Sequence, residues 1–142
     1  MQQHNAKKFG RSFFYLKNNL FLYFCTKKIM KSIILVDDDG QLRIDFEDYF
    51  NNYDRNVKCV LTTDNIDELL KFQKLVPDYI LLDIGLYAEN TLKYICKIKS
   101  IFTSTELIIY SIYEDTDFLL KAIISGANGY LSKKVTLYQI EE

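Results

Sequence analysis

Histidine and cysteine, from which many catalytic and metal sites are built, are scarce in this sequence of 142 residues. The one histidine, His4, lies in a polar stretch near the start, which disfavours a histidine-based catalytic site and a phosphohistidine carrier. Cys25, Cys59 and Cys96 are odd in number and widely spaced, and with His4 they form no pattern of paired metal ligands. We therefore expect a cytoplasmic protein with reduced thiols, in which Cys59 and Cys96 are buried as small apolar residues.

Long hydrophobic runs are absent as well. The longest unbroken apolar stretch, Leu20–Cys25, is far shorter than the roughly 18 residues that a membrane span needs. No small-residue cleavage site of the kind found in secretory leaders follows it clearly. The sequence therefore predicts neither a membrane span nor a cleaved leader.

Acidic residues are missing from the first 31 positions, which hold seven lysines and arginines, whereas the remainder carries 11 basic residues against 19 acidic ones. A basic, aromatic head is typical of a nucleic-acid contact, an anionic membrane contact or a targeting signal. This stretch nevertheless lacks sustained helical or strand periodicity. We expect residues 1–30 to be a disordered extension or a mis-assigned start, with Met30 as the first residue; an amphipathic anchor is the alternative. Residues 31–142 form the predicted domain.

From position 32 onward, short apolar runs alternate with stretches in which apolar residues recur every three to four positions. The runs predict five strands, at Ile33–Val36, Val57–Leu61, Tyr79–Leu82, Leu107–Tyr110 and Tyr130–Leu131. The recurring residues predict four helices, through Leu42/Phe46/Tyr49/Phe50, Ile66/Leu69/Leu70, Leu92/Ile95/Ile98 and Phe118/Leu119/Ala122/Ile123. Strands that are apolar on successive residues are buried on both faces, and intervening helices supply the crossovers that parallel pairing requires. The pattern predicts a doubly wound α/β sandwich around a five-stranded parallel sheet.

Turn-forming residues agree with this division of the chain. Pro77 is expected to end the second helix, and Gly126 lies where the fourth helix must stop. A fifth helix would begin near Thr136 with Leu137 and Ile140 facing inward. It would be only about two turns long, which is marginal without a partner.

Polar side chains follow four of the five strands. Three aspartates, at positions 37–39, follow the first strand, and Asp83 follows the third. Ser111 follows the fourth strand, and the segment after the fifth strand contains Lys133. Ligands of open parallel sheets bind beyond the carboxyl ends of the strands, so these groups should meet at one edge. Three carboxylates there repel one another unless a cation is present, and a hard oxygen-only set favours Mg²⁺ or Ca²⁺. Phosphate chemistry with Asp83 as nucleophile follows as a hypothesis.

Four motifs in order resemble the receiver domains of bacterial two-component response regulators, from about residue 31 to the end. They are Ile-Ile-Leu-Val-Asp-Asp-Asp at 33–39, Leu-Leu-Asp-Ile-Gly-Leu at 81–86, Ile-Ile-Tyr-Ser at 108–111 and Gly-Ala-Asn-Gly-Tyr-Leu-Ser-Lys at 126–133. The resemblance implies a flavodoxin-like three-layer sandwich. The amino-acid sequence of these motifs is most similar to that of receivers that precede a helix-turn-helix DNA-binding output domain.

The resemblance implies a role for each residue at this edge. Asp83 accepts a phosphoryl group from a sensor histidine kinase in a Mg²⁺-dependent reaction. Asp38 and Asp83 ligate Mg²⁺ directly, the Gly85 carbonyl is a third ligand, and Asp37 acts through water, whereas we expect Asp39 to cap a helix.

The resemblance also implies a switch. Ser111 and Lys133 contact the phosphoryl oxygens, and Ser111 moves while Tyr130 changes rotamer. This change alters the face made by the fourth helix, fifth strand and fifth helix, through which a homodimer is expected. Two departures from the family are the altered loop at 87–91, where the family usually has proline, and the short fifth helix, which weakens the dimer surface.

The expected function is a cytoplasmic phosphoacceptor that catalyses only its own phosphorylation and dephosphorylation, without binding nucleic acid itself. One alternative is a receiver-like interaction module that works without phosphorylation. Another is a truncated transcriptional regulator that has lost its DNA-binding domain. A nucleotide-binding α/β protein or a phosphatase is a further alternative, and the lack of a glycine-rich loop after the first strand argues against nucleotide binding.

Overall fold

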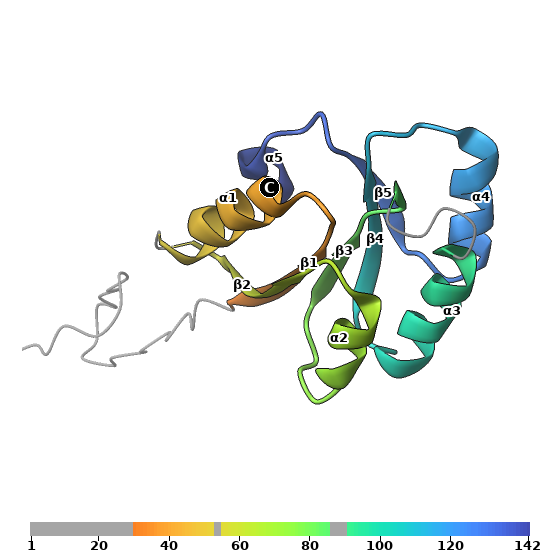
Figure 1. The fold of residues 1–142 in the computed structure, drawn as a ribbon, viewed down its shortest axis with the longest axis horizontal. Helices are drawn as coiled ribbons and strands as arrows, with labels where there is room; N and C mark the ends of the chain where they lie inside the picture. Colours follow the sequence, from red (N-terminus) through yellow and green to blue (C-terminus); the bar gives the residue numbers. More distant parts are fainter. Residues whose placement is uncertain (1–29, 53–54, 86–90) are drawn as a thin grey trace, which may run out of the picture.

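The computed structural model describes residues 30–52, 55–85 and 91–142, and these form a three-layer α/β sandwich (Figure 1). The strands are β1 (Lys31–Val36), β2 (Val57–Thr63), β3 (Tyr79–Leu82), β4 (Glu106–Ser111) and β5 (Gly129–Ser132). The helices are α1 (Gly40–Asn51), α2 (Ile66–Lys71), α3 (Thr91–Ile101), α4 (Thr116–Ile124) and α5 (Leu137–Glu141). All four strand pairs are parallel, in the order β2-β1-β3-β4-β5. The predicted doubly wound architecture is confirmed.

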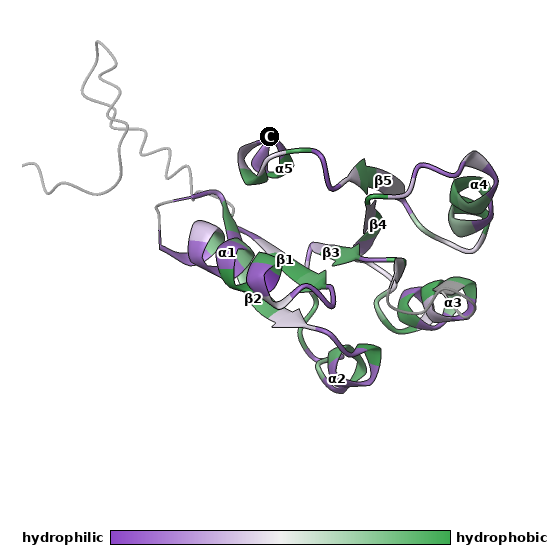
Figure 2. Ribbon diagram, turned by 45° about the horizontal axis from the view of Figure 1, so that its top comes forward, coloured by the Kyte–Doolittle hydropathy of each residue, from purple (hydrophilic) through white to green (hydrophobic). Residues whose placement is uncertain are grey.

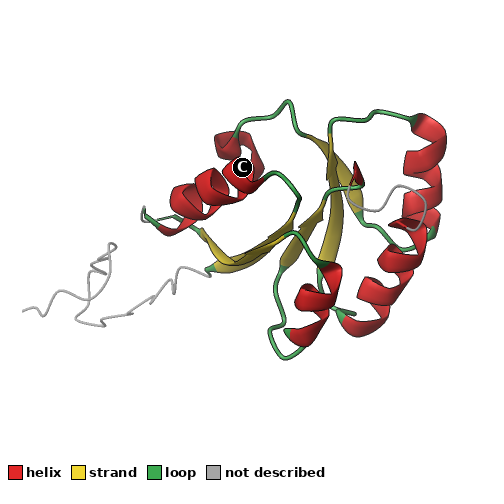
Figure 3. Ribbon diagram, viewed as in Figure 1, coloured by secondary structure: helices red, strands yellow, loops and turns green. Residues whose placement is uncertain are grey.

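The helices cover the sheet unequally: α2, α3 and α4 lie on one face, and α1 and α5 lie on the other (Figures 2 and 3). Side chains alternate between the faces along each strand. On β1, Ile34 and Val36 pack with the three-helix side, while Ile33 and Leu35 pack against Phe46 of α1. All four of these β1 side chains are buried, which is the pattern expected of a central strand.

Local capping explains where several helices begin and end. Asp39 caps α1 by accepting hydrogen bonds from the amides of Gln41 and Leu42, as predicted. Thr136 and Gln139 form a reciprocal capping box at the start of the short helix α5. Gly126 follows α4 with φ 113°, a left-handed conformation that ends the helix.

Three sequence predictions about individual residues are wrong. Helix α2 ends at Lys71 rather than at Pro77, which is buried beyond a run of turns and leads into β3. Ile123 is 48% exposed, because the inward face of α4 is centred on Ala122. Cys96 is exposed on α3, one position beyond the fully buried Ile95. The corresponding prediction for Cys59 is confirmed: this residue is buried, and burial raises the pKa of its thiol to about 12.

The helices in the described parts of the chain are all too short or too polar to cross a membrane. The predictions for residues 1–29 and for the loop positions 87–90 lie outside the described residues.

Candidate functional site

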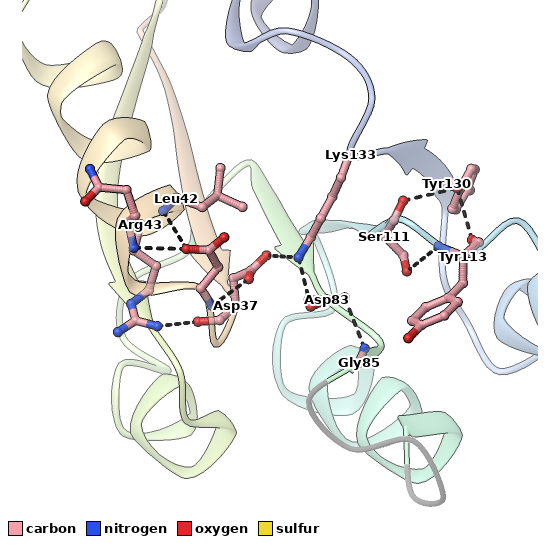
Figure 4. Close-up of polar contacts among 11 residues, drawn as sticks. Asp37, Leu42, Arg43, Asp83, Gly85, Ser111, Tyr113, Tyr130 and Lys133 are labelled. Atoms are coloured by element: carbon pink, nitrogen blue, oxygen red, sulfur yellow. Dashed lines mark hydrogen bonds and ion pairs between the residues drawn. The ribbon is translucent and has the colours of Figure 1, made fainter.

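The carboxyl edge of the sheet gathers the polar residues that the sequence singled out. Asp37 follows β1 and Asp83 follows β3, its neighbour in the sheet, while Ser111 ends β4 and Lys133 follows β5. Figure 4 shows the Lys133 side chain reaching between the two aspartates, with Ser111 further along the same edge. Parallel pairing in register explains this convergence, because each strand carries its following residue to the same side.

Three carboxylates lie close together at this edge. Asp37, Asp38 and Asp83 each offer an oxygen atom, and these oxygens lie within 4.8 Å of one another. Asp37 is 0% exposed and Asp83 is 6% exposed, whereas Asp38 faces solvent. Like charges at this spacing and burial repel strongly. The fold therefore maintains a concentration of negative charge that needs cations nearby.

Lys133 supplies one such cation. Its Nζ atom lies 2.7 Å from Asp37 Oδ2 and 2.9 Å from Asp83 Oδ2, and its side chain is only 15% exposed. The ammonium group also lies 5.8 Å from the centroid of the Tyr110 ring. Burial alone would lower the pKa of Lys133, but the bonds to the two carboxylates outweigh it and raise the pKa above its ordinary value. Lys133 is therefore fixed in its charged form between the two aspartates.

One lysine does not satisfy the buried carboxylates completely. Among the described residues, no donor is directed at Asp37 Oδ2 with hydrogen-bond geometry, although Lys133 lies within ion-pair distance of it. Burial raises the pKa of Asp37 above its usual range in spite of Lys133 and the Asp39 amide. A buried oxygen without a directed donor, in an oxygen-only ligand set, fits a hard divalent cation. These residues therefore fit a divalent metal ion.

Gly85 supports the Asp83 side chain through its backbone. Its amide donates a hydrogen bond to Asp83 Oδ1 at 3.0 Å. A Cβ atom at position 85 would lie 3.3 Å from Asp83 Oδ2, tighter than ordinary van der Waals contact. A side chain here would therefore crowd the carboxylate, while the role of the Gly85 carbonyl as a metal ligand stays a prediction.

Arg43, one turn into α1, is a site neighbour that the sequence analysis missed. Its guanidinium donates a hydrogen bond to the Asp37 carbonyl at 2.5 Å (Figure 4). It also lies 3.6 Å from Asp64 Oδ2. It thereby ties the start of α1 to the loop that carries the acidic cluster. The only sequence signal was its place four residues after the cap Asp39, which does not reveal a bond to a backbone carbonyl.

Ser111 and Tyr130 are linked to each other rather than to the carboxylates. The fully buried Ser111 accepts a hydrogen bond from the Tyr113 amide through its hydroxyl oxygen at 3.1 Å. The Tyr130 hydroxyl donates to the carbonyl oxygens of Ser111 and Tyr113, at 3.2 and 3.1 Å (Figure 4). The predicted switch residues are thus joined through the segment that leads from β4 into α4.

The site as a whole suits transfer of a phosphoryl group. A carboxylate beside a metal-binding cluster can act as the acceptor, and an ammonium group held at the same edge can neutralise phosphoryl oxygens. Phosphoryl transfer depends mainly on such positioning and charge stabilisation. The geometry is therefore adequate for this chemistry.

Comparison with known proteins identifies the family. The model of the response regulator receiver domain matches residues 33–142. The oxygen regulatory protein NreC of Staphylococcus aureus is 28% identical over 103 residues, which is 71% of this chain and 47% of the relative. The chain thus spans about half the length of the curated relatives it matches.

Solved structures show the same fold. A DNA-binding response regulator of the LuxR family from Staphylococcus aureus aligns with a TM-score of 0.64 at 20% identity, covering 78% of this chain and 92% of that one. A response regulator from Burkholderia pseudomallei, described with a phosphorylated aspartic acid, a calcium ion and citrate, aligns at 0.66 and 20% identity, covering 78% and 64%. From the match of the family model over most of the sequence, the chain belongs to the response regulator receiver domain family of two-component signalling.

Proposed function

We propose that this receiver domain accepts a phosphoryl group on Asp83 in a Mg²⁺-dependent reaction and signals through the resulting change of shape. The observation that carries the proposal is the position of Lys133, whose ammonium group lies within ion-pair distance of the buried carboxylates of Asp37 and Asp83 at one edge of the sheet. The phosphorylated aspartic acid and calcium ion of the Burkholderia relative support the same chemistry here.

In the proposed reaction, a carboxylate oxygen of Asp83 forms a bond to the phosphorus atom of a phosphohistidine on a sensor kinase. The bond from phosphorus to the histidine nitrogen breaks, and its electron pair stays on that nitrogen. Lys133, now bonded to Asp83 Oδ2, neutralises charge on the phosphoryl oxygens. Asp37, Asp38, Asp83 and the Gly85 carbonyl would hold a divalent cation, which would supply further neutralisation of that charge when bound.

The proposed switch begins at Ser111. Contact between its hydroxyl and a phosphoryl oxygen would compete with the hydrogen bond that it now accepts from the Tyr113 amide. Because Tyr130 holds the carbonyls of Ser111 and Tyr113, a shift of this segment would change the Tyr130 environment. Helix α4 also leaves Leu120 and Ile124 58% and 80% exposed, and these apolar side chains support homodimerisation through α4, β5 and α5.

The direct test is intact-mass measurement of the purified chain incubated with acetyl phosphate, with and without Mg²⁺. We expect a phosphoryl adduct only with Mg²⁺, and none on Asp83→Asn. Asp39→Asn is the matched control: it removes one carboxylate from the run of three aspartates after β1, yet asparagine still caps α1. The control should therefore form the adduct.

Failure of the folded protein to form any adduct would contradict the proposal and favour the phosphorylation-independent interaction module. An adduct that persists in Asp83→Asn would place the acceptor elsewhere. For the switch, hydrogen exchange at 111–116 should rise on phosphorylation of the wild type. Tyr130→Phe, which lacks the hydroxyl bonds, should show high exchange at 111–116 before phosphorylation.

A further inference from the structure

The loop after β1 carries two of the three clustered carboxylates. Asp37 is buried and Asp38 is exposed, and oxygens of both lie within 4.8 Å of an Asp83 oxygen. Repulsion between like charges favours loop conformations in which these carboxylates lie further apart. Ligands bind a metal ion tightly when the surrounding structure holds them in place before the ion arrives. The loop therefore needs a restraint that acts without a cation.

Arg43 provides a restraint at a single peptide unit. The Asp37 carbonyl, to which Arg43 Nη1 donates a hydrogen bond at 2.5 Å, belongs to the peptide unit that joins Asp37 to Asp38. Because a peptide unit is planar, fixing its carbonyl also fixes its amide, which belongs to Asp38. On the other side, the Asp37 amide donates to the Thr63 carbonyl of β2 at 2.9 Å. The backbone is thus held on both sides of Asp37, immediately before Asp38.

The Arg43 side chain is itself held in place. It is 22% exposed, and its Nη2 atom lies 3.6 Å from Asp64 Oδ2, in the connection between β2 and α2. Its backbone amide donates to the Asp39 carbonyl at 3.0 Å, at the start of α1. Figure 4 shows Arg43 and Lys133 on opposite sides of Asp37. Lys133 contacts carboxylates, whereas Arg43 contacts the backbone that carries them.

We propose that Arg43 is a positioning residue for the divalent cation and acts through the peptide unit between Asp37 and Asp38. The inference rests on the proposed function in one respect, the binding of a cation at this edge of the sheet. A guanidinium has donors only, so Arg43 is not a metal ligand. It holds the two loop carboxylates beside Asp83 against their mutual repulsion, before the cation binds.

Charge and positioning predict opposite results when the guanidinium is removed. A positive charge near a metal site repels a cation, so loss of the charge of Arg43 alone would tighten metal binding. Loss of the restraint would weaken metal binding, because the cation would then have to bring the carboxylates together itself. The direction of the change in affinity therefore separates the two effects.

The test uses the purified full chain and Mn²⁺ as the probe, with free Mn²⁺ measured by electron paramagnetic resonance and no phosphodonor present. We expect Arg43→Met to bind Mn²⁺ about tenfold more weakly than the wild type. Lys58→Met is the matched control: it removes one positive charge at an exposed position of β2 and should bind as the wild type does. Loss of binding in Asp38→Asn would assign the measured Mn²⁺ to this edge.

Two further variants examine the geometry of the bond. Asp64→Asn removes the partly exposed ion pair and leaves the hydrogen bond to the Asp37 carbonyl, so it should weaken Mn²⁺ binding much less than Arg43→Met does. Arg43→Lys keeps the charge but replaces the planar fork with one ammonium group on a shorter stem. It should also bind Mn²⁺ more weakly than the wild type, and it carries the test if Arg43→Met does not fold.

Two other measurements distinguish positioning from a purely structural role. Hydrogen exchange at 37–40 without metal should be faster in Arg43→Met, while exchange in β3 stays as in the wild type. In reaction with acetyl phosphate, the Mg²⁺ concentration that gives half the maximal rate should rise about tenfold. The rate at saturating Mg²⁺ should return to that of the wild type, because the added cation then brings the loop carboxylates together.

Several results would overturn the inference. Unchanged or tighter Mn²⁺ binding by folded Arg43→Met or Arg43→Lys would do so and would leave the proposed phosphoacceptor intact. Weakening of equal size in Asp64→Asn would assign the effect to the ion pair instead of the carbonyl bond. A phosphorylation rate that stays low at saturating Mg²⁺ would place Arg43 in the chemical step. Failure of the wild type itself to bind Mn²⁺ would refute the metal site, and with it both proposals.

Discussion

The two edges of the sheet use the same side chain, aspartate, in opposite ways. At the amino edge, Asp78 accepts hydrogen bonds from Lys31 Nζ at 2.7 Å and from the amide and hydroxyl of Ser32 at 2.8 and 3.0 Å. At the carboxyl edge, Asp37 is buried beside Asp83, and none of the described residues directs a donor at its Oδ2 atom with hydrogen-bond geometry. The amino edge is therefore satisfied and structural. The carboxyl edge has a carboxylate oxygen to which no described residue donates a hydrogen bond, and it is suited to bind a cation or a phosphoryl group.

The pKa values of the two aspartates follow this contrast. The hydrogen bond from Lys31, followed by that from the Ser32 amide, lowers the pKa of Asp78 below its usual range. Burial raises the pKa of Asp37. The folded state thus favours the charged form of Asp78 and disfavours the charged form of Asp37. Neutralising each residue should therefore change the free energy of unfolding in opposite directions.

The largest expected effect is the loss of Lys133. Lys133→Met leaves Asp37 and Asp83 without their cation, and we expect it to lower the free energy of unfolding by about 3 kcal/mol without Mg²⁺. Urea unfolding measures this loss, and added Mg²⁺ should recover part of it. The neighbouring Lys134→Met breaks only an exposed ion pair with Glu114 and should change the free energy of unfolding very little. Equal losses in the two variants would contradict the distinction.

A smaller loss is expected at the amino edge. Asp78→Ala removes three hydrogen bonds that join the start of β1 to the entry of β3, and should lower the free energy of unfolding by about 2 kcal/mol. The loss should be the same with and without Mg²⁺. Asp67→Ala, which removes an exposed carboxylate 3.9 Å from Lys97, is the control and should have little effect. A Mg²⁺-dependent loss in Asp78→Ala would break the proposed division between the edges.

Neutralising Asp37 should have the opposite sign. Asp37→Asn removes a buried charge that the fold disfavours, so we expect a small gain in the free energy of unfolding without Mg²⁺. The same variant should show a weaker rise of stability on addition of Mg²⁺ than the wild type. Urea unfolding with and without Mg²⁺ measures both. Loss of stability in Mg²⁺-free buffer would show that the Lys133 ion pair outweighs the cost of burial.

The smallest effect is in the dependence of stability on pH. The folded-state pKa of Asp78 is lowered, so its contribution is fully present above the ordinary aspartate pKa of about 3.9 and is lost as pH falls through the lower folded value. The difference in unfolding free energy between wild type and Asp78→Ala should therefore shrink as the pH falls from 5 toward 2. Thermal or urea unfolding across this range measures it. If the difference between the two proteins stays constant over this pH range, the charge of Asp78 contributes little to the free energy of unfolding.

The sequence predicts the fold well because the strands are short, continuous apolar runs. A sheet built from such strands is apolar on both faces, so helices must pack against both. The bounds of β3 are those of its apolar run, whereas β1 begins earlier, at Lys31, because backbone pairing with Val57 continues past the apolar residues. The sequence pattern specifies the buried face of a helix less closely. Ile123 and Cys96 each adjoin a fully buried residue on their helices, and neighbouring positions differ by about 100° around a helix.

The convergence of the site residues was also predictable, because parallel strands carry their following residues to one edge. The bridging position of Lys133 and the hydrogen bond of Ser111 to the Tyr113 amide depend on side-chain rotamers, which spacing does not specify. Arg43 went unnoticed because its partner is a backbone carbonyl, and every residue has one. The sequence thus indicates which groups meet, while the structure shows which of them are satisfied.

The most direct test of the central claim is to locate the phosphoryl group chemically. After reaction with acetyl phosphate and Mg²⁺, borohydride reduction converts an aspartyl phosphate to homoserine, and peptide mass spectrometry identifies the position. We predict conversion at Asp83, and none at Asp37, Asp38 or Asp78. Conversion at one of those residues, or none in a folded protein, would contradict the assignment of Asp83 as the phosphoacceptor.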